Sequence, residues 1–181
     1  LSAPWTGQSG KGGAGNFLKE VPVNESRATE DMYCVGATDD TLAFEDYIEG
    51  TPVMSIMYGL DIAAQNKWGQ APDLVISGPN EGNNLGFLNN NSGTVGNVNY
   101  ALASGIPAIA VSATDKNITE EHANLVADAV IEIVKELINK QKSGDKLLPK
   151  FTGLNINTPE DMSNHAGYKF TNVGWNPGEF T

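Results

Sequence analysis

Between residues 50 and 157 the sequence alternates regularly between helical and strand patterns, and this alternation restricts the fold more than any other feature. Apolar residues recur at helical spacing over 52–69, 94–104 and 120–144. Short apolar runs typical of buried strands follow each helix, at 73–77, 106–112 and 154–157. Because this order is typical of a parallel sheet with crossover helices on both faces, we predict a doubly wound α/β sandwich forming a single domain over residues 1–181.

Local signals mark the ends of these elements. Thr51-Pro52 is a helix start with proline at the first helical position, and Gly105 is a stop for the second helix. The spacing of Asn117 and Glu120 is that of a capping box. The strand at 73–77 is bounded by Gly78-Pro79 and is predicted to be buried on both faces. An alternating segment at 168–173 completes the pattern, whereas residues 5–50 are predicted to be loops that follow the end of a strand at residues 1–4.

The charge of the chain excludes two classes of partner. Eleven Lys and Arg against 22 Asp and Glu give a net charge of −11, which repels nucleic-acid polymers and anionic membranes. No apolar run approaches the length of a membrane-spanning helix, so no membrane association is expected. The low charged content of 18%, with abundant Gly, Asn, Ser and Thr, favours a secreted or vacuolar protein over a cytoplasmic one. Cys34, the only cysteine, is predicted to be an idle thiol.

The loop after the strand at 73–77 is the strongest candidate for a binding site. Ligands of open parallel sheets bind beyond the carboxyl ends of the strands, and eight of the twenty residues from Asn80 to Asn99 are asparagine. Ser92-Gly93-Thr94 then leads into a helix whose first N–H groups lack partners, which is a cradle for an anion. The alternative is that the asparagines and glycines only shape a long turn and that Ser92 or Thr94 is an ordinary helix cap.

Several blocks of the sequence, in order, resemble the SurE family of survival-protein phosphatases and nucleotidases. They are Ser2-Ala-Pro4 with Gln8-Ser-Gly10, Gly50-Thr-Pro52, the run 72–86, Ser92-Gly-Thr-Val-Gly96, the run 105–112, and Leu148-Pro149 with Leu154-Asn-Ile-Asn157. The sequence Ser77-Gly-Pro-Asn80 is similar to that of the fungal acid-phosphatase branch of the family. The resemblance implies a Rossmann-like domain that hydrolyses phosphate monoesters, typically nucleoside monophosphates, with a divalent cation such as Mg²⁺ or Mn²⁺.

The resemblance also assigns site residues. Ser9 and Asn80 fall on metal ligands of the family, while Asn84, Ser92, Gly93 and Thr94 fall on positions that line the phosphate. The family anchors its metal on two adjacent aspartates in an Asn-Asp-Asp-Gly turn, which this sequence lacks, so no catalytic residue is assigned. Three further groups of residues are given no major role in the predicted site. Asp39-Asp40 is predicted to be a solvated loop, Glu81 next to Asn80 is a minor candidate for a metal ligand, and His122 and His165 are minor candidates for general acids.

Without the aspartate pair, Ser9 and Asn80 are two neutral ligands, too few to hold Mg²⁺ against its hydration. We therefore expect the first strands of the fold to be missing from this sequence and to be supplied by preceding residues or by another polypeptide. Two functions remain open at this point: a metal-dependent phosphomonoesterase acting on a small substrate, and a non-catalytic derivative that binds anions or serves assembly. Residues 175–181 resemble a segment that the family uses in subunit contacts, so a homodimer is expected.

Overall fold

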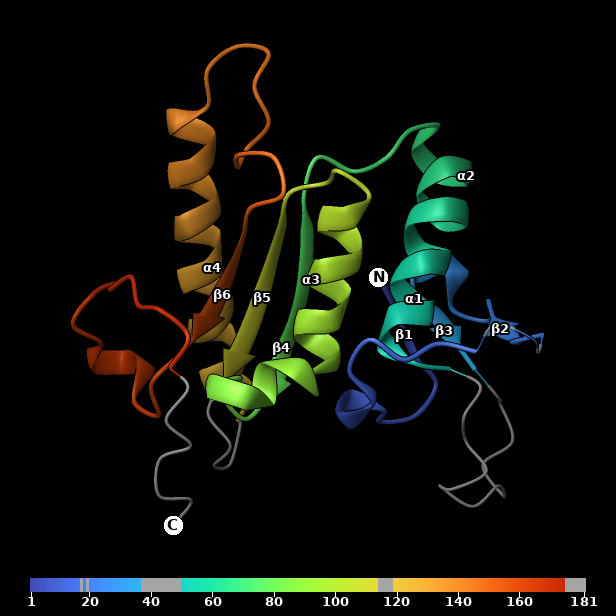
Figure 1. The fold of residues 1–181 in the computed structure, drawn as a ribbon, viewed down its shortest axis with the longest axis horizontal. Helices are drawn as coiled ribbons and strands as arrows, with labels where there is room; N and C mark the ends of the chain where they lie inside the picture. Colours follow the sequence, from blue (N-terminus) through green and yellow to red (C-terminus); the bar gives the residue numbers. More distant parts are fainter. Residues whose placement is uncertain (17, 19, 37–49, 114–118, 175–181) are drawn as a thin grey trace.

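The computed structural model describes residues 1–16, 18, 20–36, 50–113 and 119–174, and in them the chain forms an α/β fold with a parallel sheet between helices. The sheet contains β4 (Val75–Glu81), β5 (Ala108–Ala113) and β6 (Gly153–Asn157) in the order β4-β5-β6, with both pairs parallel. Helix α3 (Gly93–Ala103) covers one face of the sheet and α4 (Glu120–Lys140) covers the other (Figure 1). The predicted α/β class is confirmed.

Strand β5 is the centre of the sheet and all six of its residues are buried. Successive strand residues point to opposite faces, so Ala108 and Ala110 pack in a cluster with α3 residues such as Val98, while Ile109 and Val111 pack in a second cluster with α4. Two separate apolar layers are thereby joined through one strand, as the continuous apolar run in the sequence predicts.

The prediction that residues 73–77 form a strand buried on both faces is wrong. Strand β4 runs from Val75 to Glu81, and Ile76 is 49% exposed. The physical reason is that Val75 packs against the α3 cluster on one face of the sheet, whereas Ile76 on the other face is not part of the α4 cluster. Among the described strands, β4 pairs with β5 alone. Its register with β5 shifts between Ser77 and Asn80. Gly78 lies at this shift with φ 118°, and an added Cβ would meet the Val111 carbonyl oxygen at 2.2 Å, so the strand needs a glycine there.

The first predicted helix is confirmed as a continuous helical segment. It consists of α1 (Pro52–Tyr58), a π-helical turn (Gly59–Ala63) and α2 (Ala64–Trp68). Thr51 caps it, since its side chain accepts a hydrogen bond from the Met54 N–H (3.3 Å). Gly69 ends it in the left-handed conformation (φ 67°).

The other two helices differ from the prediction only at their ends. Ser92 is the N-cap of α3, and Thr119 caps α4 by accepting a hydrogen bond from the His122 N–H (3.1 Å). Helix α4 ends at Lys140, before the predicted end near residue 144. The prediction of a capping box from Asn117 to Glu120 is wrong, because Thr119 is the N-cap and Glu120 is the first residue of α4. Asn117 itself lies outside the described residues.

A second, small sheet has one strand at the predicted strand of residues 1–4 and two strands in the segment predicted to be loops. Its strands are β1 (Ser2–Pro4), β2 (Val23–Asn24) and β3 (Tyr33–Val35), in the order β1-β3-β2. Strand β3 is parallel to β1 and antiparallel to β2. The strand at residues 1–4 is confirmed, whereas β2 and β3 were not predicted because strands of two or three residues carry no detectable periodicity. Asp39-Asp40 lies outside the described residues.

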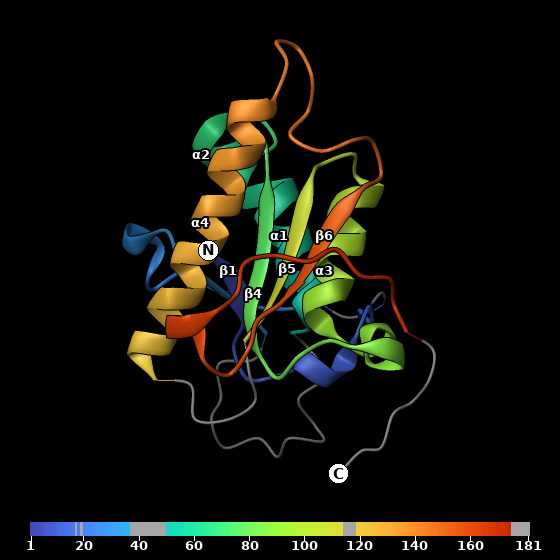
Figure 2. The same cartoon turned by 90° about the vertical axis from the view of Figure 1, so that its left-hand side faces the viewer.

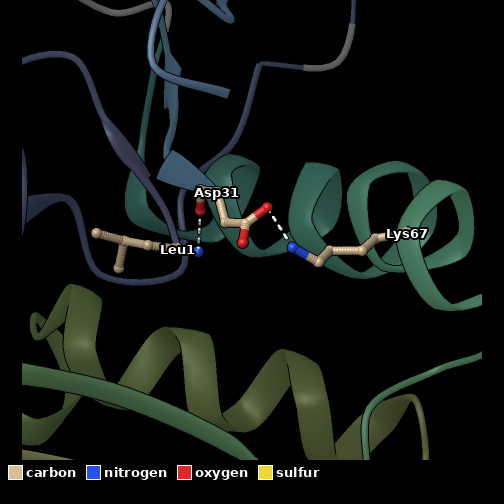
Figure 3. A network of polar contacts seen from close by, with 3 residues as sticks. All are labelled: Leu1, Asp31 and Lys67. Carbon is tan, nitrogen blue, oxygen red and sulfur yellow. Dashed lines mark hydrogen bonds and ion pairs between the residues drawn. The ribbon is translucent and has the colours of Figure 1, made fainter. Parts of the chain in front are cut away.

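Polar contacts at Asp31 connect β1 to the second half of the first helix (Figure 3). The Leu1 main-chain nitrogen donates to the Asp31 carbonyl oxygen (2.6 Å), and the Asp31 carboxylate forms an ion pair with Lys67 of α2. Both side chains of this pair are about half exposed, so the pair itself adds little stability.

The chain after β6 forms no strand at 168–173; it crosses in front of the sheet in Figure 2. The Tyr168 hydroxyl fixes this segment to α4 by donating to the Glu132 carboxylate (3.1 Å). Residues 175–181 lie outside the described residues. None of the helices within the described ranges is sufficiently long and apolar to cross a bilayer.

Candidate functional site

The carboxyl ends of β4, β5 and β6 form a row of polar side chains. Because the three strands are parallel, these ends meet at one edge of the sheet, the lower edge in Figure 1. The register pairs Asn80 of β4 with Ser112 of β5, and Ser112 with Asn157 of β6. Two amides and one hydroxyl therefore lie side by side across the sheet. This edge is where ligands bind in open parallel sheets, and we call it the polar rim.

Asn84 lies on the polar rim and is held at three points. Its amide nitrogen donates to the Ser112 hydroxyl (2.6 Å), its N–H donates to Asn157 Oδ1 (2.7 Å), and its carbonyl oxygen accepts a hydrogen bond from Asn155 Nδ2 (3.1 Å). Asn84 is only 6% exposed, so these bonds are made largely away from water. The loop after β4 is thereby fixed over the ends of β5 and β6 rather than being a loose turn.

The start of α3 shows the helix cap that sequence reasoning left as an alternative. The Ser92 hydroxyl accepts a hydrogen bond from the Val95 N–H (3.1 Å), and Ser92, Gly93 and Thr94 are buried. Capping by Ser92 satisfies one of the first N–H groups of the helix, and the N–H groups of Gly93 and Thr94 have no acceptor within the helix. The positive end of the α3 dipole is formed by the same residues.

Gly93 brings the start of α3 against the N-terminal loop. A Cβ at this position would lie 2.5 Å from Pro52 Cγ and 3.1 Å from the Ser9 carbonyl oxygen. The absence of a side chain therefore allows α1, Ser9 and α3 to meet. Sequence reasoning placed Ser9 and Gly93 in one site, and the structure brings their main chains together, although the Ser9 residue itself is exposed.

The amide nitrogen of Asn80 is bound to main-chain carbonyl oxygens of its own loop. Nδ2 donates to the carbonyl oxygens of Glu81 and Gly82 (both 2.8 Å), which leaves Oδ1 as the acceptor able to face a cation. The Glu81 carboxylate is exposed at the end of β4. In the part of the chain that the structure describes, no three His, Cys, Asp or Glu side chains gather closely enough to hold a metal ion. Since Mg²⁺ and Mn²⁺ require several oxygen ligands, usually with carboxylates, the described donors do not fit a complete cation site.

The two histidines lie in different surroundings. His122 is in the first turn of α4, and His165 is in the exposed segment after β6, where its Nδ1 accepts a hydrogen bond from the Gly167 N–H (3.3 Å). A groove of about 560 Å³ lies beside α3, lined by residues that include Val53, Asn89, Val95 and Tyr100. Its lining carries no charged side chain and none of the six predicted site residues, so the polar rim and not this groove carries the candidate chemistry.

Comparison with known proteins gives the family. A family model described as survival protein SurE matches residues 1–179. The chain belongs to the SurE family. The solved SurE protein from Aquifex aeolicus has the same fold, with a TM-score of 0.63 and 33% sequence identity over 84% of this chain and 51% of that one.

Relatives of this SurE-family chain carry two kinds of name. An acid phosphatase of Yarrowia lipolytica is 37% identical over 123 residues, which are 62% of this chain and 34% of the relative. A 5'-nucleotidase SurE of Fervidobacterium nodosum is 40% identical over 132 residues, 71% of this chain and 47% of the relative. A 5'-nucleotidase SurE of Thermosipho melanesiensis is 34% identical over 177 residues, 93% of this chain and 58% of the relative. The chain thus spans between about a third and three fifths of the relatives it matches.

The rule that sites follow strand ends pointed to the loop from Asn80 onward, and the family resemblance assigned Asn80 and Asn84 within it, but neither assigned Asn155 and Asn157 to the site. Their signal was present in the sequence, since two asparagines two residues apart in a strand point to the same side. What the sequence could not give was the register that sets Asn157 opposite Ser112.

Proposed function

We propose that this protein hydrolyses phosphate monoesters at the polar rim. The proposal is supported by the names of the relatives, acid phosphatase and 5'-nucleotidase. The observation that carries it is Asn84, which is buried and fixed next to Ser112 at the end of the central strand. An amide held this rigidly suits the recognition of one oxygen position of a phosphoryl group.

The donors at the rim are neutral, and this matters because the chain carries a net charge of −11. A phosphate dianion is repelled by the overall field and must be held by local hydrogen bonds. The amide nitrogen of Asn84 has two protons, of which one goes to Ser112, and we assign the second to a phosphate oxygen. We assign the N–H groups of Gly93 and Thr94 to the same phosphate group, whose negative charge the α3 dipole stabilises. Such preformed donors lower the energy of the charge that develops on the phosphoryl oxygens.

Metal dependence is a separate part of the proposal. The family resemblance favours Mg²⁺ or Mn²⁺, with Ser9 and Asn80 as two of its ligands. Because the described residues do not complete such a site, this part rests on the resemblance and requires carboxylates in addition to these two oxygens. The substrate class that the relatives' names favour is a nucleoside monophosphate, and the acid-phosphatase relative favours broader esters.

The absence of a carboxylate cluster among the described residues favours a second candidate function. In it, the polar rim binds a phosphate group without hydrolysing it, and the protein acts as an anion-binding or assembly module. Both candidates require the Asn84 and α3 donors, and only the first requires turnover.

Hydrolysis of 4-nitrophenyl phosphate and of a nucleoside monophosphate by the full protein, with Mg²⁺ or Mn²⁺ and with EDTA, separates the two candidates. We expect turnover that EDTA abolishes. Thr94→Ala is expected mainly to raise KM, Asn80→Ala to weaken metal binding, and Asn99→Ala, at an exposed position of α3, to change neither. Phosphate binding without turnover under every metal condition would exclude the enzyme and support the module.

A further inference from the structure

Strand β6 holds the main chain of Asn84 through two of its own side chains. Asn157 accepts the hydrogen bond from the Asn84 N–H (2.7 Å), and Asn155 donates to the Asn84 carbonyl oxygen (3.1 Å). The two asparagines reach the loop together because they lie two residues apart in the strand. Both polar groups of the Asn84 main chain are therefore bound, which fixes the peptide planes on either side of this residue.

The Asn155 side chain also extends the same support along the loop. Its Nδ2 donates to Asn89 Oδ1 (3.0 Å), and Asn89 in turn donates to the Gly86 carbonyl oxygen (2.9 Å). A single amide thus connects two points of the loop, five residues apart, to the strand. Asn155 is exposed and Asn84 is buried, so a change at Asn155 removes these bonds without opening a cavity in the core.

We propose that Asn155 and Asn157 are positioning residues, which act on a bound phosphoryl group only by fixing Asn84. This inference rests on the proposed function, which provides the phosphoryl group that Asn84 contacts. With its main chain held by β6 and its amide held by Ser112, the orientation of Asn84 is determined before a ligand arrives. Removing one support allows the second N–H of the Asn84 amide to leave the position in which it meets the phosphoryl oxygen. Loss of a support behind a ligating residue typically costs about 10- to 100-fold in activity or affinity.

A double-mutant cycle in the full protein tests this inference. The variants are Asn84→Ala, Asn157→Ala and their combination, with Asn155→Ala as a second single variant and Asn83→Ala as the matched control. Asn83 is adjacent to Asn84 and donates from its own amide to the Thr158 carbonyl oxygen (3.3 Å), so its loss removes one loop anchor without touching Asn84. The measurements are kcat/KM for 4-nitrophenyl phosphate, the dissociation constant of inorganic phosphate, and the melting temperature.

We expect Asn157→Ala and Asn155→Ala to lower kcat/KM and phosphate affinity by about 10-fold or more, and the control to lower them by less than about twofold. In the Asn84→Ala background, Asn157→Ala should cause no further loss of kcat/KM or phosphate affinity, because Asn157 acts only through the Asn84 side chain. Equal losses in the presence and absence of the Asn84 side chain, or a control as impaired as Asn157→Ala, would overturn the inference in favour of general loop anchoring. If Asn157→Ala does not fold, the cycle is run with the exposed Asn155→Ala instead.

The outcome is distinguishable from failure of the proposed function. If the wild-type protein binds inorganic phosphate but does not hydrolyse esters, the enzymatic function fails and the cycle in phosphate affinity still decides the positioning roles. If it hydrolyses esters and the cycle is additive, the function stands and the positioning roles fail. If it neither binds phosphate nor hydrolyses esters, both are overturned.

Discussion

Substitution of Gly93 by alanine tests the close approach at the start of α3. The added Cβ would lie 2.5 Å from Pro52 Cγ and 2.9 Å from Pro52 Cβ, well inside ordinary contact distance. Pro52 is the first residue of α1 and its ring is rigid, so the backbone of α1 or α3 must move. Overpacking of this kind costs about 1–3 kcal/mol.

The gain from replacing a helical glycine by alanine opposes this cost. Alanine is favoured over glycine by about 1 kcal/mol inside a helix, and by less in its first turn. With a gain of about 0.5 kcal/mol in the first turn, the net expectation is a loss of about 0.5–2.5 kcal/mol, which for a chain of this size lowers the melting temperature by roughly 1–10 °C. Ser9, whose carbonyl oxygen lies 3.1 Å from the same Cβ position, would be displaced as well, so phosphate affinity should also fall.

Urea denaturation followed by circular dichroism measures the free energy of unfolding of Gly93→Ala. Asn99→Ala, an exposed position of the same helix, is the control and should gain a few tenths of a kcal/mol, about the propensity difference. If Gly93→Ala were as stable as the wild type or more so, the close packing of α1 on α3 would be wrong, and with it the placement of Ser9 next to the phosphate donors.

Three further predictions concern other parts of the fold. Ile76→Ala should cost at most about 1 kcal/mol because the side chain is half exposed, whereas Ile109→Ala in the fully buried strand should cost about 2–5 kcal/mol in the same urea assay. Equal costs would contradict the exposure of Ile76. Thr119→Ala should destabilise α4 by about 1 kcal/mol and Thr119→Ser should not, as measured by thermal unfolding. Burial, and after it the hydrogen bond to Glu25, raise the pKa of Tyr58 to about 12. The contribution of this tyrosine to stability is therefore present below about pH 10 and is lost as the pH rises through 12. Ultraviolet titration of Tyr58→Phe should lack the late transition, and a titration curve equal to that of the wild type would contradict the assignment.

The sequence determined the central parts of the fold well because their signals are local. The apolar run of β5 and the Thr51-Pro52 helix start are read within a few residues, and both were predicted correctly. The exposure of Ile76 was not predicted, because the pattern of Val75 and Ile76 is the same whether helices cover both faces of a strand or only one. Strand β3 was missed for a different reason, since three residues are too few to show a period.

The same distinction separates the site residues that were predicted from those that were not. The loop that contains Asn84 follows a strand with a clear end, so the place of this loop could be predicted from its neighbours in the chain, and the family resemblance assigned Asn84 within it. The importance of Asn155 and Asn157 depends on bonds across 71 and 73 residues of sequence, and such bonds follow only from the pairing of β5 with β6. The local sequence pattern therefore identifies the loop that would contact a ligand, whereas the long-range strand register identifies the residues that hold Asn84 in place.

Among the described strands, β4 pairs with β5 alone, and this determines where a further strand could add to the sheet. An edge strand offers unpaired N–H and C=O groups to which a strand of another molecule can add. Pro79 lacks an N–H, and the exposed Glu81 carboxylate adds a charge at the end of the same strand. Among the residues of this strand, the short stretch around Ile76 is therefore the part whose free side suits the addition of a further strand, whether that strand comes from the same protein or from another molecule.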